Sequence, residues 1–505
     1  AVSMCGPGGS ASRMRWQWVV VAAALTLPPG AAYDPEHRVE SARLYGDVVE
    51  KAYYYLDLLV GSPVPQRASV IADTGSSLAA FPCTGCSHCG SHLDALFDVS
   101  KSDTAQWVPC KPEEHCSSCE RGHCGYVQSY TEGSSISGAW LRDYVTLGDE
   151  LQHNPPVLAR IGCHSKETKL FYTQKANGIF GMAPGRGGKV SILKELFRDK
   201  EHVNTEIFAM CLAKEGGLLT VGGYNATLHV SNASGTPTEP LWIPMRSSVA
   251  YTVQLTSMAV VGLPKDDGTV SSGFGSTLVD SGTTYTFLSH RAYGHLVRFV
   301  DRFCSQTRGC GAKESPKCWK LTGPEQLQAF PVIEVSFASV SAPVLWHADA
   351  YMYRKSTHSN SWCYGFEDNG DVPETVLGAT WMINHNVIFD IAGKRLGVVD
   401  AHCPSFTKRP PPPAGSATAR SRTPSDTHWW PSAEQMWSVL PGSRVLTMVA
   451  LVLLAVVGLA KVGINLAAAR SKAREVAAAA SAGATTPQAP SPTRPRRSRA
   501  RGNGE

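Results

Sequence analysis

Several apolar or alternating stretches, each bounded by Gly, Pro or Ser, predict short β-strands along this chain. Residues 53–60 are followed by Gly61-Ser62-Pro63, which predicts a hairpin. Residues 126–138 alternate on both sides of a Gly-Ser tip and predict a second hairpin. Residues 291–303 have a helical pattern. Elsewhere the hydrophobic pattern favours β-strands.

Two of the apolar strands end in the same short motif. Residues 70–72 lead into Asp73-Thr74-Gly75-Ser76, and residues 277–279 lead into Asp280-Ser281-Gly282-Thr283. The sequence contains no other Asp-Ser/Thr-Gly tripeptide. A single tripeptide of this kind arises by chance, so two unrelated turns are the alternative interpretation. Two copies that each follow an apolar strand favour two lobes of similar design.

The residue types of these two motifs suit the hydrolysis of amides by activated water. One carboxylate takes a proton from water and one carboxylic acid donates a proton, and two carboxyls about 3 Å apart share a single proton. We therefore expect Asp73 and Asp280 to be catalytic. Glycines would allow close approach, and hydroxyls would bind the outer carboxylate oxygens or the opposite loop. The supporting residues expected from this reasoning are Thr74, Gly75, Ser76, Ser281, Gly282 and Thr283.

These motifs resemble those of pepsin-like aspartic proteases, which implies an all-β, bilobal fold and no metal or other cofactor. Residues 386–391 and 395–400 are similar to the closing strands of that family. In that family a hairpin called the flap closes over the substrate and carries a Tyr near its tip, a place that Tyr130 matches. An ordinary surface hairpin is the alternative. The expected substrate-binding residues are Tyr130, Glu132, Gly133 and Ser134. If strand alternation continues through the tip, Tyr130 and Glu132 face the substrate together, and Glu132 can pair with an arginine.

The chain contains 15 cysteines, many for a cytosolic enzyme. Cys-x-x-Cys pairs in the insertion at residues 83–124 suit either zinc or disulfides, and an extracytosolic location favours disulfides. Seven candidates lie in this insertion and seven later, so complete pairing requires at least one bridge between the two sets. The candidates are Cys83, Cys86, Cys89, Cys110, Cys116, Cys119, Cys124, Cys163, Cys211, Cys304, Cys310, Cys318, Cys363 and Cys403. The family resemblance implies that Cys211 pairs with Cys403.

Composition divides the 505-residue chain into successive segments. We expect a signal peptide (1–32), a short pro-segment or N-terminal extension (33–51), an N-terminal lobe (52–238) and a C-terminal lobe (239–406). A Pro/Ser-rich stalk (407–443), a transmembrane helix (444–469) and a basic cytosolic tail (470–505) follow. An N-terminal anchor and a buried soluble helix are the alternatives for the two apolar segments. Asn225 and Asn232 begin glycosylation sequons.

The insertion, the flap sequence Tyr130-Thr131-Glu132-Gly133-Ser134 and the predicted anchor are most similar to the plasmepsin V group of these enzymes. This resemblance implies cleavage of exported or secreted proteins at Arg-x-Leu motifs, in the endoplasmic reticulum or Golgi, by a monomeric type I membrane protein with a lumenal catalytic domain. A general nepenthesin-like secretory or vacuolar protease and an inert binding relative are the alternatives. A net charge of +5, much of it in the tail, gives no reason to expect a nucleic-acid partner.

Overall fold

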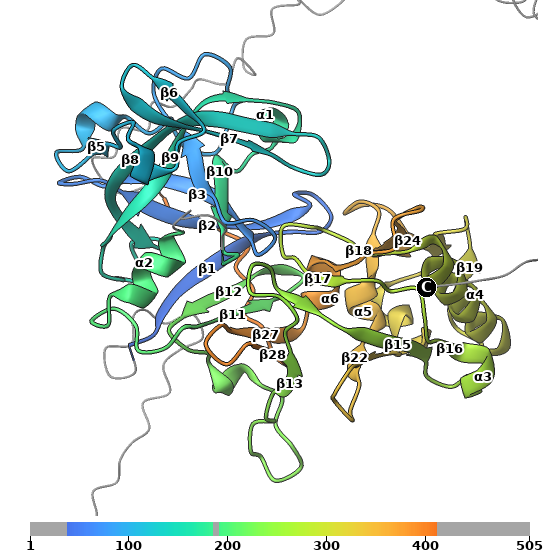
Figure 1. Ribbon diagram of the computed structural model, residues 1–505. Helices are drawn as coiled ribbons and strands as arrows, with labels where there is room; N and C mark the ends of the chain where they lie inside the picture. The colour runs from blue at the N-terminus through green and yellow to red at the C-terminus, as the bar shows by residue number, and fades with distance from the viewer. Residues whose placement is uncertain (1–37, 185–190, 412–505) are drawn as a thin grey trace, which may run out of the picture. The chain divides into compact units, whose positions relative to one another are not determined.

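Strands make up most of the regular structure in the computed structural model, which describes residues 38–184 and 191–411 (Figure 1). The largest sheet has 15 strands, and the path through it crosses from one half of the chain to the other. In spatial order its strands are β13 (Leu241–Pro244), β28 (Arg395–Asp400), β27 (His385–Asp390), β11 (Ile207–Leu212), β12 (Glu215–Val221), β1 (Glu40–Asp47), β2 (Tyr53–Val60), β3 (Gln66–Asp73), β10 (Gly178–Gly181), β4 (Ala79–Pro82), β9 (Val157–Glu167), β8 (Ser135–Leu147), β7 (His123–Ser129) and β6 (Ser118–Glu120), with β5 (Gln106–Trp107) paired to β8.

Three smaller sheets lie in the C-terminal lobe. Five strands form the first of them: β14 (Thr252–Val253), β17 (Thr277–Val279), β26 (Thr375–Leu377), β18 (Thr286–Leu288) and β25 (Phe366–Asp368). The second contains β16 (Thr269–Val270), β15 (Leu255–Val260), β21 (Ile333–Phe337) and β22 (Val344–Trp346). The third contains β19 (Ala312–Lys313), β20 (Cys318–Lys320), β24 (Ser361–Tyr364) and β23 (Met352–Arg354).

Helices are few and short in the described part of the chain, apart from one. They are α1 (Leu170–Thr173), α2 (Ile192–Arg198), α3 (Lys265–Gly268), α4 (His290–Gln306), α5 (Ala348–Tyr351) and α6 (Ala379–Met382), with the 3₁₀ turns η1 (Val99–Lys101), η2 (Pro112–Glu114), η3 (Ala226–Leu228) and η4 (Pro324–Ala329). The 17-residue α4 confirms the predicted helix, with Ser289 accepting from the N–H of Ala292 as its N-cap. The fold is therefore mostly β rather than purely β.

The two Asp motifs occupy equivalent places in the two lobes. β3 ends at Asp73 and runs parallel to β10, which ends at Gly181. β17 ends just before Asp280 and runs parallel to β26, which ends just before Gly378. The N–H of Met182 donates to the carbonyl of Asp73 (2.7 Å), and the N–H of Asp280 donates to the carbonyl of Leu377 (3.0 Å). Each aspartate is thus fixed by a parallel neighbour strand, so the two lobes share this part of their design.

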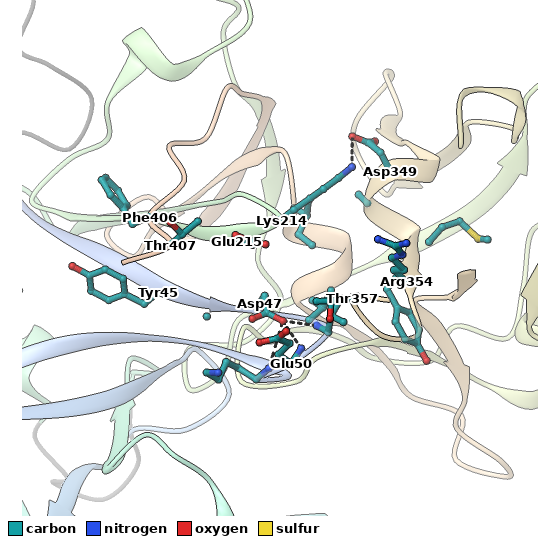
Figure 2. A pocket seen from close by; sticks show the side chains of 18 of the residues that line it. Tyr45, Asp47, Glu50, Lys214, Glu215, Asp349, Arg354, Thr357, Phe406 and Thr407 are labelled. Atoms are coloured by element: carbon teal, nitrogen blue, oxygen red, sulfur yellow. Dashed lines mark hydrogen bonds and ion pairs between the residues drawn. The ribbon is translucent and has the colours of Figure 1, made fainter. Parts of the chain in front are cut away.

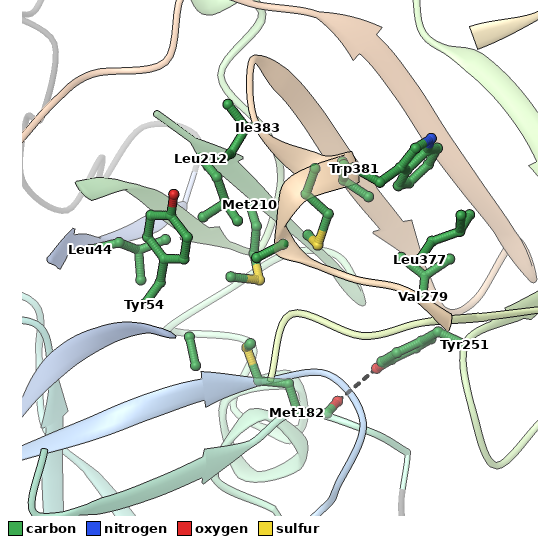
Figure 3. Packing of buried hydrophobic residues seen from close by; sticks show 14 of the residues in the cluster. Leu44, Tyr54, Met182, Met210, Leu212, Tyr251, Val279, Leu377, Trp381 and Ile383 are labelled. Atoms are coloured by element: carbon green, nitrogen blue, oxygen red, sulfur yellow. Dashed lines mark hydrogen bonds between the residues drawn. The ribbon is translucent and has the colours of Figure 1, made fainter. Parts of the chain in front are cut away.

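The largest cluster of buried apolar side chains among the described residues extends through both lobes. Figure 3 shows Met182 of the N-terminal lobe facing Tyr251, whose hydroxyl donates to the Met182 carbonyl at 2.7 Å. The same cluster contains Met210 of β11 and Trp381 of α6, both fully buried. The lobes are therefore joined through packed side chains as well as through the shared sheet.

The segment 33–51, expected as a short pro-segment or N-terminal extension, contributes a strand to the large sheet. This strand, β1, pairs with both β12 and β2 and is mostly buried. The sequence of β1 has little apolar alternation and begins with a charged residue, Glu40. The Glu40 carboxylate is buried and lies 2.7 Å from Nδ1 of His202. A pattern of apolar positions does not reveal a strand whose buried charge is satisfied by a residue far along the chain.

The described cysteines are joined in seven disulfides: Cys83–Cys163, Cys86–Cys89, Cys110–Cys119, Cys116–Cys124, Cys211–Cys403, Cys304–Cys310 and Cys318–Cys363. The pair expected from the family resemblance, Cys211 with Cys403, is present. Cys83–Cys163 is the bridge between the two sets that parity required. All cysteines of the insertion are therefore used in disulfides, which leaves no thiolate there for zinc.

The end of the described chain packs against the N-terminal lobe. We call residues 401–411 the strap. Phe406 lies against Tyr45 and beneath the guanidinium of Arg43. Arg409 donates to both carboxylate oxygens of Asp57, at 2.8 and 2.9 Å. The predicted stalk, 407–443, therefore begins with residues that are bound to the lobe, because a buried carboxylate on β2 requires a cationic partner.

Four predicted segments lie wholly or mostly outside the described residues: the signal peptide, the remainder of the stalk, the membrane span at 444–469 and the basic tail. Within residues 38–184 and 191–411, no helix has the length and apolar character needed to cross a membrane. The sequons lie within the described part. Asn225 and Asn232 each accept hydrogen bonds from the hydroxyl residue two positions later, and Asn232 is exposed.

Candidate active site

Reciprocal hydrogen bonds lock the two Asp loops together. The backbone N–H of Thr74 donates to Oγ of Ser281 (3.1 Å), and the N–H of Ser281 donates to Oγ1 of Thr74 (2.9 Å). Each hydroxyl also donates across the interface, Thr74 to the Val279 carbonyl (3.0 Å) and Ser281 to the Ala72 carbonyl (2.8 Å). Both hydroxyl side chains are buried. These four bonds hold the two aspartates at a fixed separation.

The carboxyls of Asp73 and Asp280 contact each other through a side-chain hydrogen bond. The inner oxygen of each accepts from a glycine two residues later: Asp73 from the N–H of Gly75 (2.8 Å) and Asp280 from the N–H of Gly282 (2.9 Å). A Cβ added at Gly282 would lie 2.3 Å from Oδ1 of Asp73. Gly75 and Gly282 therefore leave no room for a side chain, because an added Cβ would push the two aspartate carboxyls apart.

Hydroxyl groups bind the outer carboxylate oxygens, as the sequence predicts. Ser76 donates to Oδ2 of Asp73, and Thr283 donates to Oδ2 of Asp280 at 2.6 Å. These bonds fix the rotation of both carboxyl groups, so that their inner oxygens stay directed at each other.

Electrostatics favour a single proton on this pair. Burial raises the pKa of Asp73 to about 8, and the negative charge of Asp280 adds to that increase. The hydrogen bonds from Ser76 and Gly75 act in the opposite direction but do not outweigh burial. At neutral pH the pair therefore contains one carboxylic acid and one carboxylate, the acid and base that hydrolysis by water needs.

The flap hairpin is present, with β7 paired to β8 and Tyr130 at the start of the tip. The phenol oxygen of Tyr130 is buried and faces Ser76 and Asp73. Burial and the nearby Asp73 charge raise the pKa of this phenol, which is therefore neutral at physiological pH. Gly133 adopts φ +86°, a conformation that the tip turn needs and that glycine adopts without strain. The structure thus brings the Tyr130 phenol close to Asp73, one of the two aspartates.

The flap tip does not continue the strand alternation from which the orientation of Glu132 was predicted. β7 ends at Ser129, and residues 130–134 form a turn rather than a continuing strand. Glu132 is exposed, and the Ser134 hydroxyl donates to its carboxylate. Its charge still reaches the Tyr130 phenol, so Glu132 lies close to the tyrosine. The Lys169 ammonium lies next to Gly133 and adds a positive charge at the tip.

A pocket of about 400 Å³ lies between the turn that follows β1 and residues 349–362 of the C-terminal lobe. Figure 2 shows Lys214 and Asp349 facing each other there, and their charged groups lie 3.8 Å apart. Neither Asp73 nor Asp280 lines this pocket. The pocket adjoins the second Asp loop. Lys51 lines the pocket, and the next residue, Ala52, accepts a hydrogen bond at its carbonyl from the Thr284 hydroxyl of that loop.

Sequence reasoning missed the support beneath Tyr130. Phe171 of α1 packs on the Tyr130 ring, with centroids 4.9 Å apart, and the buried side chains of His164 and Glu167 lie behind Phe171. Phe171 carries no motif and is far from the flap in sequence. The sequence held no clear signal, because His164 and Glu167 share the end of β9 with Ser165 and Lys166, which are exposed.

Comparisons with known proteins agree with this geometry. The family model for eukaryotic aspartyl protease matches residues 53–401. The chain is 38% identical over 416 residues to aspartic protease 5 of Toxoplasma gondii, an alignment that covers 73% of this chain and 38% of that protein. It is 25% identical over 448 residues to plasmepsin V of Plasmodium falciparum, covering 72% of this chain and 73% of the relative. Aspartic proteinase 36 of Arabidopsis thaliana is 26% identical over 384 residues, covering 70% and 75%.

The chain thus spans well under half the length of its Toxoplasma relative. The family match, in contrast, covers more than half of this chain and includes both Asp loops, the flap and the closing strands. This chain belongs to the eukaryotic aspartyl protease family.

Proposed function

We propose that this protein is an aspartic endopeptidase in which Asp73 and Asp280 activate water for attack on a peptide bond. The reciprocal hydrogen bonds between Thr74 and Ser281 carry this proposal, because they hold two carboxyls in contact in the geometry that lets them share a proton. No covalent intermediate is needed, since both proton transfers are made by the pair itself.

In this mechanism Asp73 begins as the acid and Asp280 as the base. The raised pKa of Asp73 keeps its proton in place at neutral pH. Asp280 takes a proton from the water that attacks the carbonyl carbon, while Asp73 donates its proton to the carbonyl oxygen. Tyr130 would cover the reacting groups, and its neutral phenol can donate a hydrogen bond.

For the substrate, we propose peptides with an Arg-x-Leu motif, with arginine two residues before the P1 position. Glu132 would bind the guanidinium in a two-pronged pair. Its exposure and its proximity to Tyr130 support this role, since the carboxylate needs only to exchange the Ser134 hydroxyl for the guanidinium. The pair would contribute about 1.5–3 kcal/mol, roughly ten- to a hundredfold in discrimination.

For the location, we propose the secretory pathway, in the endoplasmic reticulum or Golgi, with the catalytic part in the lumen. The seven disulfides support an oxidising compartment. A C-terminal transmembrane helix at 444–469, a cleaved signal peptide at 1–32, glycans at Asn225 and Asn232 and a monomeric state complete the proposal.

The test is cleavage of peptides containing Arg-x-Leu, Lys-x-Leu or Ala-x-Leu by the full chain in detergent. We expect the wild type to prefer arginine and Glu132→Gln to lose that preference, with lysine poorer because it lacks the planar fork. Glu113→Gln, an exposed glutamate of η2, is the matched control and should retain the preference.

An unchanged arginine preference in Glu132→Gln would exclude its role and favour the general secretory protease. Absence of cleavage of every peptide, and of denatured protein substrates, would favour the inert binding relative.

A further inference from the structure

A cluster of buried ionisable side chains lies behind the flap and takes no part in the proposed chemistry. It consists of His92, His164 and Glu167, whose side chains are 1%, 0% and 0% exposed. The Glu167 carboxylate lies at its centre and has three hydrogen-bond partners: Nε2 of His92, Nδ1 of His164 and the backbone N–H of Gly90, each at 3.0 Å. We call these three side chains the flap-support cluster.

The hydrogen bonds indicate the protonation state of each member. His92 has acceptors at both ring nitrogens, the Glu167 carboxylate at Nε2 and the Gln174 carbonyl at Nδ1 (3.2 Å). Both bonds can form only when the ring carries two protons. His164 donates through Nδ1 alone, since its Nε2 is buried without a partner, and burial lowers the pKa of this histidine. Although burial opposes it, hydrogen bonds from both histidines bring the pKa of Glu167 down to about 2.

The cluster is connected to the flap through backbone and ring contacts. Glu167 is the last residue of β9 and pairs with Ile136, at the start of the returning flap strand. Behind Tyr130, the His164 ring meets the edge of Phe171, with centroids 6.3 Å apart, and Phe171 packs on Tyr130 at 4.9 Å. Displacement of Glu167 or His164 would therefore move the surface on which Tyr130 rests.

The cysteine-rich insertion supplies the other side of the cluster. The Glu167 N–H donates to the His88 carbonyl (2.8 Å), and the His88 ring stacks on Tyr172 of α1. Between Cys89 and His92, Gly90 approaches α1 so closely that an added Cβ would lie 1.8 Å from the Tyr172 carbonyl oxygen. His92 then binds the Gln174 carbonyl, the C-cap of α1. The loop 86–93 thus braces α1 against β9.

Other ionisable groups around the cluster do not compete for its protons. From the flap side, Tyr126 and Tyr130 are phenols whose pKa burial raises, so they stay neutral. Lys166 and Lys169 flank Glu167 in sequence and are exposed, and His88 lies against Tyr172. Among the described groups of this cluster, His92 is therefore the one that needs two ring protons to keep both of its hydrogen bonds.

We propose that His92, Glu167 and His164 are positioning residues that hold Tyr130 over the aspartates, and that doubly protonated His92 makes this hold tighter in acid. When His92 loses a proton, either the Gln174 carbonyl or the Glu167 carboxylate loses its donor, and α1 with Phe171 loosens under the flap. Peptides therefore bind more tightly in an acidic compartment than at neutral pH. This binding consequence rests on the proposed peptidase function, whereas the effect on the flap does not.

Hydrogen exchange of the full chain without substrate, at pH 5.5 and pH 7.5 and corrected for the intrinsic pH dependence, tests the hold on the flap. We expect peptides covering residues 126–136 of the wild type to exchange about three- to tenfold faster at pH 7.5. In His92→Gln the amide still donates to Glu167 but does not titrate, so the pH difference should vanish. In Glu167→Gln exchange should be fast at both pH values.

His202→Gln is the matched control, because His202 also pairs with a buried carboxylate, that of Glu40, away from the flap. It should leave exchange at 126–136 unchanged. In cleavage assays KM should rise about three- to tenfold between pH 5.5 and 7.5 for the wild type and His202→Gln, but not for His92→Gln, with kcat of the three alike at each pH.

Equal corrected exchange of the wild-type flap at the two pH values would overturn the inference without any variant. So would a pH difference that survives in His92→Gln, or one that His202→Gln also abolishes. If no peptide is cleaved at all, the proposed function fails, while hydrogen exchange still decides the role of the cluster. If His92→Gln does not fold, Glu167→Gln and the wild-type comparison decide it.

Discussion

The strap that follows the last strand should contribute measurably to stability through one guanidinium. Arg409 binds both carboxylate oxygens of Asp57 and also Oδ2 of Asp94 at 2.8 Å. The Asp57 side chain is 0% exposed, that of Asp94 8% and that of Arg409 16%. Arg409→Met keeps the apolar stem and removes the charge, so it isolates the contribution of the ion pairs.

The expected loss follows from burial. Removing one partner of a buried ion pair costs about 3–5 kcal/mol, because the other charge is left uncompensated. The lower end applies here, since Arg409 is partly reachable by water and Nε of Arg67 remains 3.7 Å from Asp57. We therefore expect Arg409→Met to lower the free energy of unfolding by about 3 kcal/mol near pH 8.

The loss should shrink in acid. Burial raises the pKa of Asp57 to about 6, although Arg409 lowers it. A carboxyl whose pKa is higher in the folded state binds more protons when folded, so its ionisation weakens the fold as pH rises through that window. Without Arg409 the pKa rises further and the cost of ionisation grows. At pH 5 Asp57 is mostly neutral in both proteins, so the difference between them is smaller than at pH 8.

Denaturant unfolding of the full chain with intact disulfides, followed by tryptophan fluorescence at pH 5 and pH 8, measures this difference. Arg198→Met is the control, because Arg198 pairs with Glu195 at 2.9 Å but its side chain is 58% exposed. It should cost under about 1 kcal/mol at both pH values. The reasoning would be refuted if both variants lost the same free energy of unfolding. It would also be refuted if Arg409→Met lost more at pH 5 than at pH 8.

Other predictions concern the two aspartates. Asp280→Ala should abolish peptide cleavage while thermal unfolding stays close to wild type, and substantial residual cleavage would refute the dyad. Ser281→Ala leaves the Thr74 N–H and the carbonyl it served without partners, so denaturation should show a loss of about 2–4 kcal/mol, and a loss near zero would contradict the lock. Gly282→Ala should lower kcat about a hundredfold in a folded protein, because its Cβ would lie 2.3 Å from the Asp73 carboxylate. In a pH profile kcat should fall above about pH 8 as Asp73 loses its proton, and a flat profile to pH 10 would contradict the shared proton.

The sequence alone determined those features that are written in short local patterns. An apolar strand followed by Asp-Thr-Gly or Asp-Ser-Gly gave the two loops, and the glycines and hydroxyls of those loops take the hydrogen bonds that their chemistry implies. Helical spacing identified α4, and alternation identified the flap strands. In each case neighbouring residues contain the whole signal, so no knowledge of distant contacts is needed.

Only the tertiary structure decided where charged residues are buried and what satisfies them. The Glu40 carboxylate of β1 meets His202, the Arg409 guanidinium of the strap meets Asp57, and the flap rests on a cluster that joins His92 to Glu167. At the flap tip a turn ends the alternation on which the orientation of Glu132 was predicted. A buried charge is stable only with a partner, and when that partner is distant in the chain, the pattern of neighbouring residues does not contain it.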